Sequence, residues 1–220
     1  MKTFNQYIQE GVNDPSIFKA VFLAGGPGSG KSFVVGKTAL TALGFKVVNS
    51  DDAFENAMKK AGMEMSPENI FSVQGQELRG KSKALTGKKL DIYITGRLGL
   101  VIDGTGKDYD KIKKQRIELE KLGYETSMIF VNTDEDTALD RNRKRERSLP
   151  DATTSKMWKA VQSNLGKFQG MFGDNLIIVD NSDGQDINQG TLRAYREVQK
   201  WAKKPPKNGK AQRWIKQQSK

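Results

Sequence analysis

The residues best suited to chemistry form one glycine-rich segment near the amino terminus. The segment follows the pattern G-x-x-x-x-G-K-S and consists of Gly25, Gly26, Pro27, Gly28, Ser29, Gly30, Lys31 and Ser32. Its glycines allow successive backbone N–H groups to surround phosphate oxygens, and a helix that begins directly after them favours negative charge at its amino end. Lys31 can reach the β- and γ-phosphates of a nucleotide, and the Ser32 hydroxyl can bind Mg²⁺. An apolar run before the segment and a helical pattern after it favour a site for ATP and Mg²⁺ over an ordinary glycine-rich turn.

Two acidic residues, Asp51 and Asp52, lie just beyond the second apolar run of the chain. In phosphate transfer the acceptor hydroxyl must be oriented and must lose its proton, and a carboxylate beyond a strand end is suited to both tasks. We therefore expect Asp51 to be the base, with Asp52 as the weaker candidate. The alternative is that one of the two only caps the next helix.

A third acidic residue, Asp103, follows the central apolar run and precedes Gly104 and Thr105. A carboxylate at this place can hold Mg²⁺ directly or through water. Gly104 permits a tight turn, while Thr105 either touches the substrate or caps the turn. We expect Asp103 and Ser32 to bind the metal.

A dense cluster of cations, with the sequence Arg-Asn-Arg-Lys-Arg-Glu-Arg, begins at Arg141. In a helix, Arg141 and Arg145 would share one face and Arg143 would lie on the other. Cations packed this closely repel one another unless a polyanion lies near. We expect a mobile lid over about residues 134–152 that closes over ATP and brings an arginine to the transferring phosphate. The alternative is a solvated basic helix face.

The composition limits the available chemistry. The chain has 220 residues, no cysteine and no histidine, which excludes disulfides, thiolate metal sites, a zinc site and a histidine base. Any acid–base chemistry therefore falls to carboxylates, lysine or tyrosine. With 36% hydrophobic and 29% charged residues, we expect a soluble, cytoplasmic protein. No stretch has the roughly 20 apolar residues of a membrane helix, so we expect no membrane partner.

Short apolar runs alternate with helical patterns along the chain, which is typical of a parallel sheet with helices on both faces. We expect an α/β fold with five parallel strands, at 20–23, 45–48, 98–102, 126–131 and 176–179. The expected helices lie at 31–43, 52–62, 66–88, 108–122, 134–147, 153–170 and 187–203. Ligands of such sheets bind beyond the carboxyl ends of the strands, where all four motifs fall.

Basic residues dominate the carboxyl-terminal end of the chain. The segment Lys200–Lys220 holds eight of them and no acid, so most of the net charge of +11 lies there. Two prolines and a glycine in Pro205–Gly209 are expected to break any helix. Such a tail suits a nucleic-acid surface, on which Trp214 would stack against a base, and a solvated disordered terminus is the alternative.

Together the motifs resemble those of P-loop kinases, in the branch of polynucleotide 5′-kinases and zeta toxins. The resemblance covers about residues 19–180. It rests on the glycine-rich loop, on Ser50-Asp51-Asp52, on Val101-Ile102-Asp103-Gly104-Thr105, and on the arginine cluster with Pro150 beyond it. It implies a P-loop NTPase fold with a helical lid, and ATP and Mg²⁺ as cofactors.

The resemblance also implies roles for individual residues. Lys31 and Arg145, with Arg141 beside it, would contact the γ-phosphate, and Asp51 would be the carboxylate base. The adenine would lie near the lid and the loop that contains Asn181.

The first ten residues, Met-Lys-Thr-Phe-Asn-Gln-Tyr-Ile-Gln-Glu, resemble the capsid-targeting leader of internal proteins of tailed bacteriophages. This implies a phage-encoded protein, in the host cytoplasm or packaged in the virion, that a prohead protease cuts after Glu10. The alternative is an amphipathic docking helix with Phe4, Tyr7 and Ile8 on one face. We expect a leader or docking helix over 1–15, a kinase domain over 16–203 and a basic tail over 204–220.

Two departures from the resemblance leave the acceptor open. Polynucleotide kinases carry an arginine shortly after the acidic pair, where this chain has Phe54 and Glu55, and the turn at Asp103 is closer to the zeta type. The leading hypothesis is an ATP-dependent kinase of a nucleic-acid 5′-hydroxyl. The others are a zeta-like kinase of a nucleotide sugar or other small acceptor, and a packaged nucleic-acid-binding protein with an idle P-loop.

Overall fold

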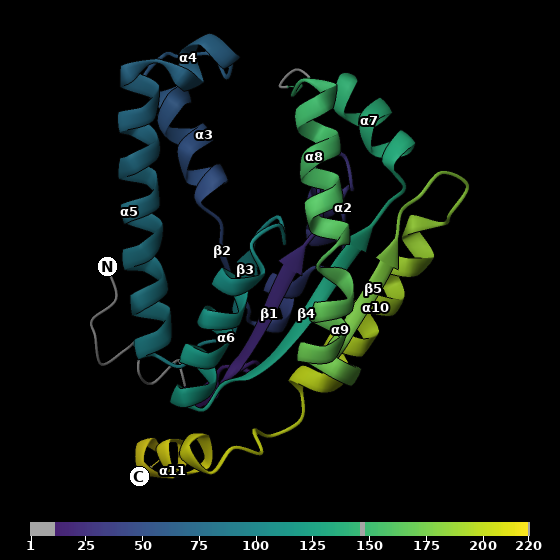
Figure 1. The fold of residues 1–220 in the computed structure, drawn as a ribbon. Coiled ribbons are helices and arrows are strands. Elements are labelled where there is room, and N and C mark those ends of the chain that lie inside the picture. Colours follow the sequence, from purple (N-terminus) through teal and green to yellow (C-terminus); the bar gives the residue numbers. More distant parts are fainter. Residues whose placement is uncertain (1–11, 146–147, 220) are drawn as a thin grey trace.

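Five apolar runs form the strands of one parallel sheet (Figure 1). They are β1 (Lys19–Ala24), β2 (Lys46–Val48), β3 (Leu100–Asp103), β4 (Glu125–Asn132) and β5 (Leu176–Asp180), in the order β2-β3-β1-β4-β5. All four neighbouring pairs are parallel, so the predicted fold class is confirmed. The computed structural model describes residues 12–145 and 148–219. The predicted N-terminal helix and the cleavage site at Glu10 lie outside these residues.

Helices connect the strands. They are α2 (Lys31–Lys37), α3 (Ser50–Lys60), α4 (Pro67–Phe71), α5 (Val73–Thr95), α6 (Tyr109–Leu122), α7 (Glu135–Arg143), α8 (Asp151–Gln162), α9 (Leu165–Phe172), α10 (Ile187–Ala202) and α11 (Gly209–Gln218), with 3-10 turns at η1 (Leu40–Leu43) and η2 (Gly173–Asn175). Within the described parts of the chain, none is long and apolar enough to cross a membrane.

Three predicted helices are divided in the structure, two of them at a residue with a clear local cause. The first ends before Ala39, whose φ of 42° lies in the left-handed region and cannot continue an α-helix. The second is split into α4 and α5 by Ser72, which is extended and caps α5 by accepting a hydrogen bond from the Gly75 N–H. The third is split into α8 and α9 near Asn164.

The sheet is buried on both faces because successive side chains of each strand point to opposite sides. On one face Phe22 and Phe130 pack with Phe168 of α9, in a cluster that also takes in α5, α6 and α8. On the other face Val21 and Leu23 pack with residues of α2 and α10. The central strands therefore appear in the sequence as continuous apolar runs without alternation.

Two groups of helices extend past the carboxyl ends of the strands (Figure 1). On one side α3, α4 and α5 are joined by a separate small core, in which Phe54 and Met58 of α3 pack with Ile70 of α4. On the other side stand α7 and α8. The carboxyl ends of β1 and β3 lie between these two groups of helices, and the candidate site lies at these strand ends.

The basic carboxyl-terminal segment is folded rather than free of helix, which corrects one expectation. After the prolines, Asn208 caps α11 by accepting a hydrogen bond from the Lys210 N–H at 2.9 Å. Ala211 is buried, and the ring of Trp214 lies edge-on to Phe18 with 5.5 Å between ring centroids. Because Phe18 directly precedes β1, α11 lies at the amino ends of the strands, at the opposite edge from the glycine-rich loop (Figure 1).

Candidate active site

The glycine-rich loop leaves β1 at Gly25 and leads into α2 at Lys31. Gly28 and Gly30 have φ values of 76° and 81°, in the left-handed region. A Cβ at Gly28 would lie 2.3 Å from the Ala138 carbonyl oxygen, and one at Gly30 would lie 2.2 Å from the Asn181 amide nitrogen. The backbone conformation and the close neighbours both require glycine here. The loop thus has the shape of a phosphate cradle, which the sequence motif predicts.

A cavity of about 410 Å³ opens over this loop and unites most of the predicted donor-site residues. It is lined by Gly25, Gly26, Pro27, Gly30, Lys31, Ser32, Asp51, Thr105, Asn142, Arg145, Leu149 and Met157. Asp51 comes from the first turn of α3, and Arg145 lies just beyond α7. The structure therefore brings Asp51, Arg145 and the loop to one space, which we call the donor cavity.

Asn181 and Arg141 support the loop from behind and are not among the residues that line the donor cavity. The buried Asn181 amide donates to the Ser29 carbonyl at 2.8 Å, and the Arg141 guanidinium donates to the Asn181 carbonyl at 2.7 Å. Both residues therefore help to position the loop, and their predicted contacts with a nucleotide stay predictions.

A network of charged and amide groups lies at the carboxyl ends of β2 and β3. Lys31 forms an ion pair with Asp103, both with side chains largely shielded from solvent. The Asn49 amide donates to Asp103 at 2.9 Å and to Asp52 at 3.0 Å, so it holds two carboxylates near each other. Desolvation, followed by repulsion from Asp103, raises the pKa of Asp52 above its usual value.

The first turn of α3 explains how the acidic pair is presented. The cap of α3 is Asn49, whose side-chain oxygen accepts a hydrogen bond from the Asp51 N–H at 2.8 Å. The alternative that Asp51 or Asp52 is the cap is therefore wrong, and both side chains are left available. Asp51 lines the donor cavity, whereas Asp52 is directed into the network with Asn49.

The residues predicted to bind Mg²⁺ supply hard oxygen donors, the chemistry that this ion requires. Ser32 is the second residue of α2 and lines the donor cavity. Asp103 is the last residue of β3 and lies beside Lys31. No cluster of three or more acidic residues in the described chain forms a complete metal cage. Mg²⁺ commonly takes one or two protein ligands and fills its shell with water and substrate phosphates, so Ser32 and Asp103 would suffice as its protein ligands. The Ser29 hydroxyl, buried in the loop with no partner among described residues, likewise fits an anionic ligand.

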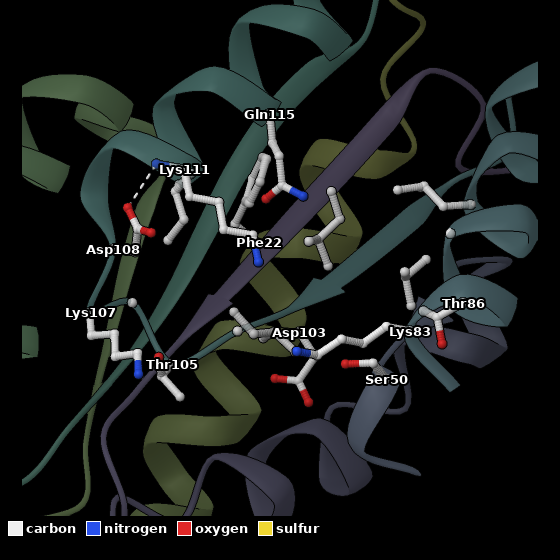
Figure 2. A pocket seen from close by; sticks show the side chains of 18 residues that line it. Phe22, Ser50, Lys83, Thr86, Asp103, Thr105, Lys107, Asp108, Lys111 and Gln115 are labelled. Carbon is white, nitrogen blue, oxygen red and sulfur yellow. Dashed lines mark hydrogen bonds between the residues drawn. The ribbon is translucent and has the colours of Figure 1, made fainter. Parts of the chain in front are cut away.

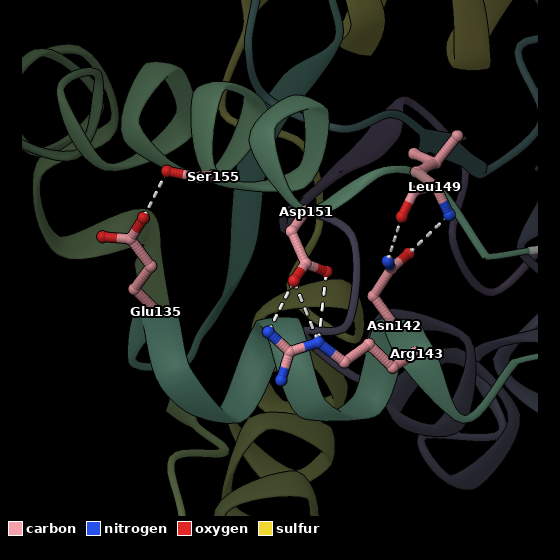
Figure 3. Close-up of polar contacts among 6 residues, drawn as sticks. All are labelled: Glu135, Asn142, Arg143, Leu149, Asp151 and Ser155. Atoms are coloured by element: carbon pink, nitrogen blue, oxygen red, sulfur yellow. Dashed lines mark hydrogen bonds and ion pairs between the residues drawn. The ribbon is translucent and has the colours of Figure 1, made fainter.

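The predicted lid is shorter as a helix than the charge pattern indicates. α7 ends at Arg143, and Asn142 then exchanges two hydrogen bonds with the backbone of Leu149, at 2.7 and 3.2 Å (Figure 3). Arg141 and Arg145 consequently do not share a helix face, which corrects that prediction. The last arginine of the predicted helix, Arg147, lies outside the described residues.

An ion pair joins the two helices of the lid. The Arg143 guanidinium donates to the Asp151 carboxylate of α8 at 2.5, 3.0 and 3.2 Å (Figure 3). Arg143 lowers the pKa of Asp151 below its usual value, and Asp151 raises that of Arg143. Arg143 therefore ties α7 to α8, and among the described residues Arg145 is the arginine that lines the donor cavity.

A second cavity, of about 470 Å³, lies next to the donor cavity, between α5, β3 and α6 (Figure 2). Asp103 lines it, and Thr105 lines both cavities. Its other polar side chains include Ser50, Thr86 and Gln115 and three lysines, Lys83, Lys107 and Lys111. We call it the acceptor-side cavity.

Sequence reasoning missed Asn49 and the three lysines. Asn49 had a visible signal, since an asparagine directly before a helical run is a typical cap. The lysines had none, because Lys83 is distant in sequence from Lys107 and Lys111 and only the fold brings the three to one space.

The parallel sheet and the glycine-rich loop between β1 and α2 define the chain as a P-loop protein. It belongs to the family described as AAA domain, whose profile matches residues 21–167. No curated protein sequence matches the chain.

Solved structures share the fold at low sequence identity. A gluconokinase from Sinorhizobium meliloti 1021 has a TM-score of 0.50 and 15% identity over 83% of this chain and 94% of that one. A chain of the PezAT chromosomal toxin–antitoxin system of Streptococcus pneumoniae has a TM-score of 0.55 and 14% identity over 90% of this chain and 96% of that one. A chain of the Pnkp1/Rnl/Hen1 RNA repair complex has a TM-score of 0.52 and 20% identity over 68% of this chain and 46% of that one.

Proposed function

We propose that this chain is an ATP-dependent kinase that transfers the γ-phosphate to a hydroxyl group of an acceptor. The observation that carries the proposal is the meeting of two cavities at one point. The donor cavity contains the phosphate cradle, the acceptor-side cavity adjoins it, and Thr105 lines both. A hydroxyl group held beside Asp103 would therefore lie near the last phosphate of a nucleotide in the cradle.

Each charged residue of the site has a task in this reaction. Lys31, now paired with Asp103, would turn to the β- and γ-phosphates when a nucleotide enters the cradle. Asp51 would orient the acceptor hydroxyl and take its proton, and Arg145 would stabilise the charge on the transferring group. Mg²⁺ held through Ser32 and Asp103 would neutralise charge on the phosphate oxygens.

The first acceptor to test is a nucleic-acid 5′-hydroxyl, with a nucleotide sugar or other small phosphorylated compound as the alternative. The bounded acceptor-side cavity favours a single nucleotide unit or a small compound at the reacting end. The basic helix α11 would contribute to binding only if the acceptor is a longer nucleic-acid strand. β1 has six residues and separates α11 from the cradle by roughly 20 Å, at about 3.3 Å per residue.

The test is transfer of radiolabelled γ-phosphate to a panel of acceptors: 5′-hydroxyl DNA and RNA, nucleosides, nucleoside monophosphates and UDP-sugars. We expect transfer to at least one class, and its loss in Lys31→Ala protein that keeps the circular-dichroism spectrum of the wild type. Transfer that persists in folded Lys31→Ala protein contradicts the proposal. ATP binding without transfer to any acceptor would instead favour an idle P-loop.

A further inference from the structure

We infer that the acceptor-side cavity recognises a phosphate group of the acceptor through Lys83, Lys107 and Lys111, and that the acceptor is a nucleotide unit, free or at the end of a strand. This inference rests on the proposed kinase function and specifies its acceptor. It does not involve the basic segment around α11, which lies at the other edge of the sheet.

The three lysines reach the cavity from different parts of the chain. Lys83 belongs to α5, Lys107 to the turn after β3, and Lys111 to the first turn of α6. Figure 2 shows Lys83 and Lys111 extending from opposite helices into the same space, with Lys107 at its edge beside Thr105. None of the three forms an ion pair with a carboxylate in the described part of the chain.

The two carboxylates that line this cavity are already engaged. Asp103 is paired with Lys31 and accepts from Asn49. Asp108 caps α6 by accepting a hydrogen bond from the Lys111 N–H at 3.0 Å. The three lysines are exposed and outnumber the two carboxylates that line the cavity, one of which is already paired with Lys31, so the cavity wall carries an excess of positive charge that an anion would offset. A phosphate group carries the charge and the acceptor oxygens to do so.

The interior of the cavity is apolar and indicates what accompanies the phosphate. Phe22 and Ile102 of the sheet, with Leu90 of α5 and Ile112 of α6, line it beneath the charged groups. An apolar surface below a cationic rim suits a flat ring attached to a phosphate, and a cavity of about 470 Å³ lies in the size range of small-ligand sites. A nucleotide has these two parts, and its sugar carries the hydroxyl group that would receive the γ-phosphate.

The contribution of the three cavity lysines is tested with two triple variants that have the same net charge. The cavity variant carries Lys83→Gln, Lys107→Gln and Lys111→Gln. The control carries Lys88→Gln, Lys113→Gln and Lys114→Gln, which are exposed lysines of α5 and α6 that do not line the cavity. Equilibrium dialysis measures binding of thymidine 3′-phosphate, UDP-N-acetylglucosamine, a 5′-hydroxyl oligonucleotide and thymidine.

We expect the cavity variant to weaken binding of at least one phosphate-bearing probe about tenfold or more, while thymidine is affected little. The control should change each affinity less than about threefold, and ATP affinity should hold in both variants. Comparison of the three phosphate-bearing probes distinguishes the free nucleotide, the nucleotide sugar and the strand end. Equal losses in both variants, an equal loss for thymidine, or no binding to wild-type protein overturns the inference.

A steric variant tests the same site without a change of charge. Gly87 of α5 lines the cavity and a Cβ there meets no atom within 4 Å, so Gly87→Phe can be accommodated and adds an aromatic ring at the cavity wall. Gly80 of the same helix has equally open surroundings and does not line the cavity, so Gly80→Phe is the control. Only Gly87→Phe should abolish probe binding, and equal behaviour of the two variants overturns the inference.

Because binding is measured without phosphate transfer, the proposed kinase function and the proposed binding site can be refuted independently of each other. Probe binding that depends on the cavity lysines, together with no phosphate transfer in the wild type, would retain the binding site and refute the kinase. Phosphate transfer that is indifferent to both cavity variants would retain the kinase and refute this site.

Discussion

Trp214 distinguishes a structural role for α11 from a role in stacking on nucleic acid. Its ring lies edge-on to Phe18, 5.5 Å away between centroids, and it belongs to the cluster that covers one face of the sheet. We predict that Trp214→Ala lowers the free energy of unfolding. A tryptophan buries about 150–250 Å² when fully enclosed. Trp214 is partly buried, so about 100 Å² at roughly 25 cal/mol per Å² gives about 2.5 kcal/mol.

The assay is urea unfolding followed by circular dichroism. With a slope of about 2–3 kcal/mol per molar urea, the midpoint should fall by about 1 M. Arg213→Ala is the matched control, because Arg213 is the exposed neighbour on the same helix and its removal should cost less than about 0.5 kcal/mol. If Trp214→Ala unfolds at the same midpoint as Arg213→Ala but binds oligonucleotides more weakly, the packing argument is refuted and base stacking is favoured.

Three further predictions concern the site and its lid. Asp51→Asn should slow phosphate transfer by about 10²–10⁴-fold with little change in ATP affinity, and a larger effect of Asp52→Asn would move the base to that residue. Arg145→Ala should lower kcat more than ATP affinity, whereas Arg143→Ala should be milder because its guanidinium is held by Asp151; equal effects would indicate general electrostatics. Asp134 caps α7, and hydrogen bonds from Thr137 lower its pKa from 3.8 to about 2. Its stabilisation is therefore present above about pH 4 and is lost as the pH falls towards 2. At neutral pH Asp134→Ala should cost about 1 kcal/mol in urea unfolding, and the difference from wild type should shrink in acid.

The parts of the site that are contiguous in sequence could be predicted, because local spacing determines them. The glycine-rich loop lies between a strand and a helix as expected, and Asp51 and Asp103 lie at adjoining strand ends. In a parallel sheet the carboxyl ends of all strands share one edge, so residues just beyond a strand are brought together whatever their separation along the chain.

The parts that depend on contacts between distant segments could not be predicted. The run after Arg141 consists mostly of good helix formers, yet the helix ends early because Asn142 binds the backbone of Leu149. Lys83 and Lys111 resemble residues of any solvated helix face until the fold brings α5 and α6 to the same cavity. α11 did carry a local signal, since Ala211, Trp214 and Ile215 have helical spacing, but its charge and preceding prolines obscured this.

The positions of the cations explain why a net charge of +11 says little about the acceptor. The sheet separates two basic regions: α11 lies at the amino ends of its strands, and the acceptor-side lysines lie towards the carboxyl ends. Exposed charges more than about 10 Å apart are largely screened at ordinary salt, so the two regions act independently. A small acceptor in the acceptor-side cavity would therefore be influenced by Lys83, Lys107 and Lys111 and not by the tail. Only an acceptor long enough to pass along the sheet would meet both regions, and for that acceptor alone the basic carboxyl-terminal helix would contribute to binding.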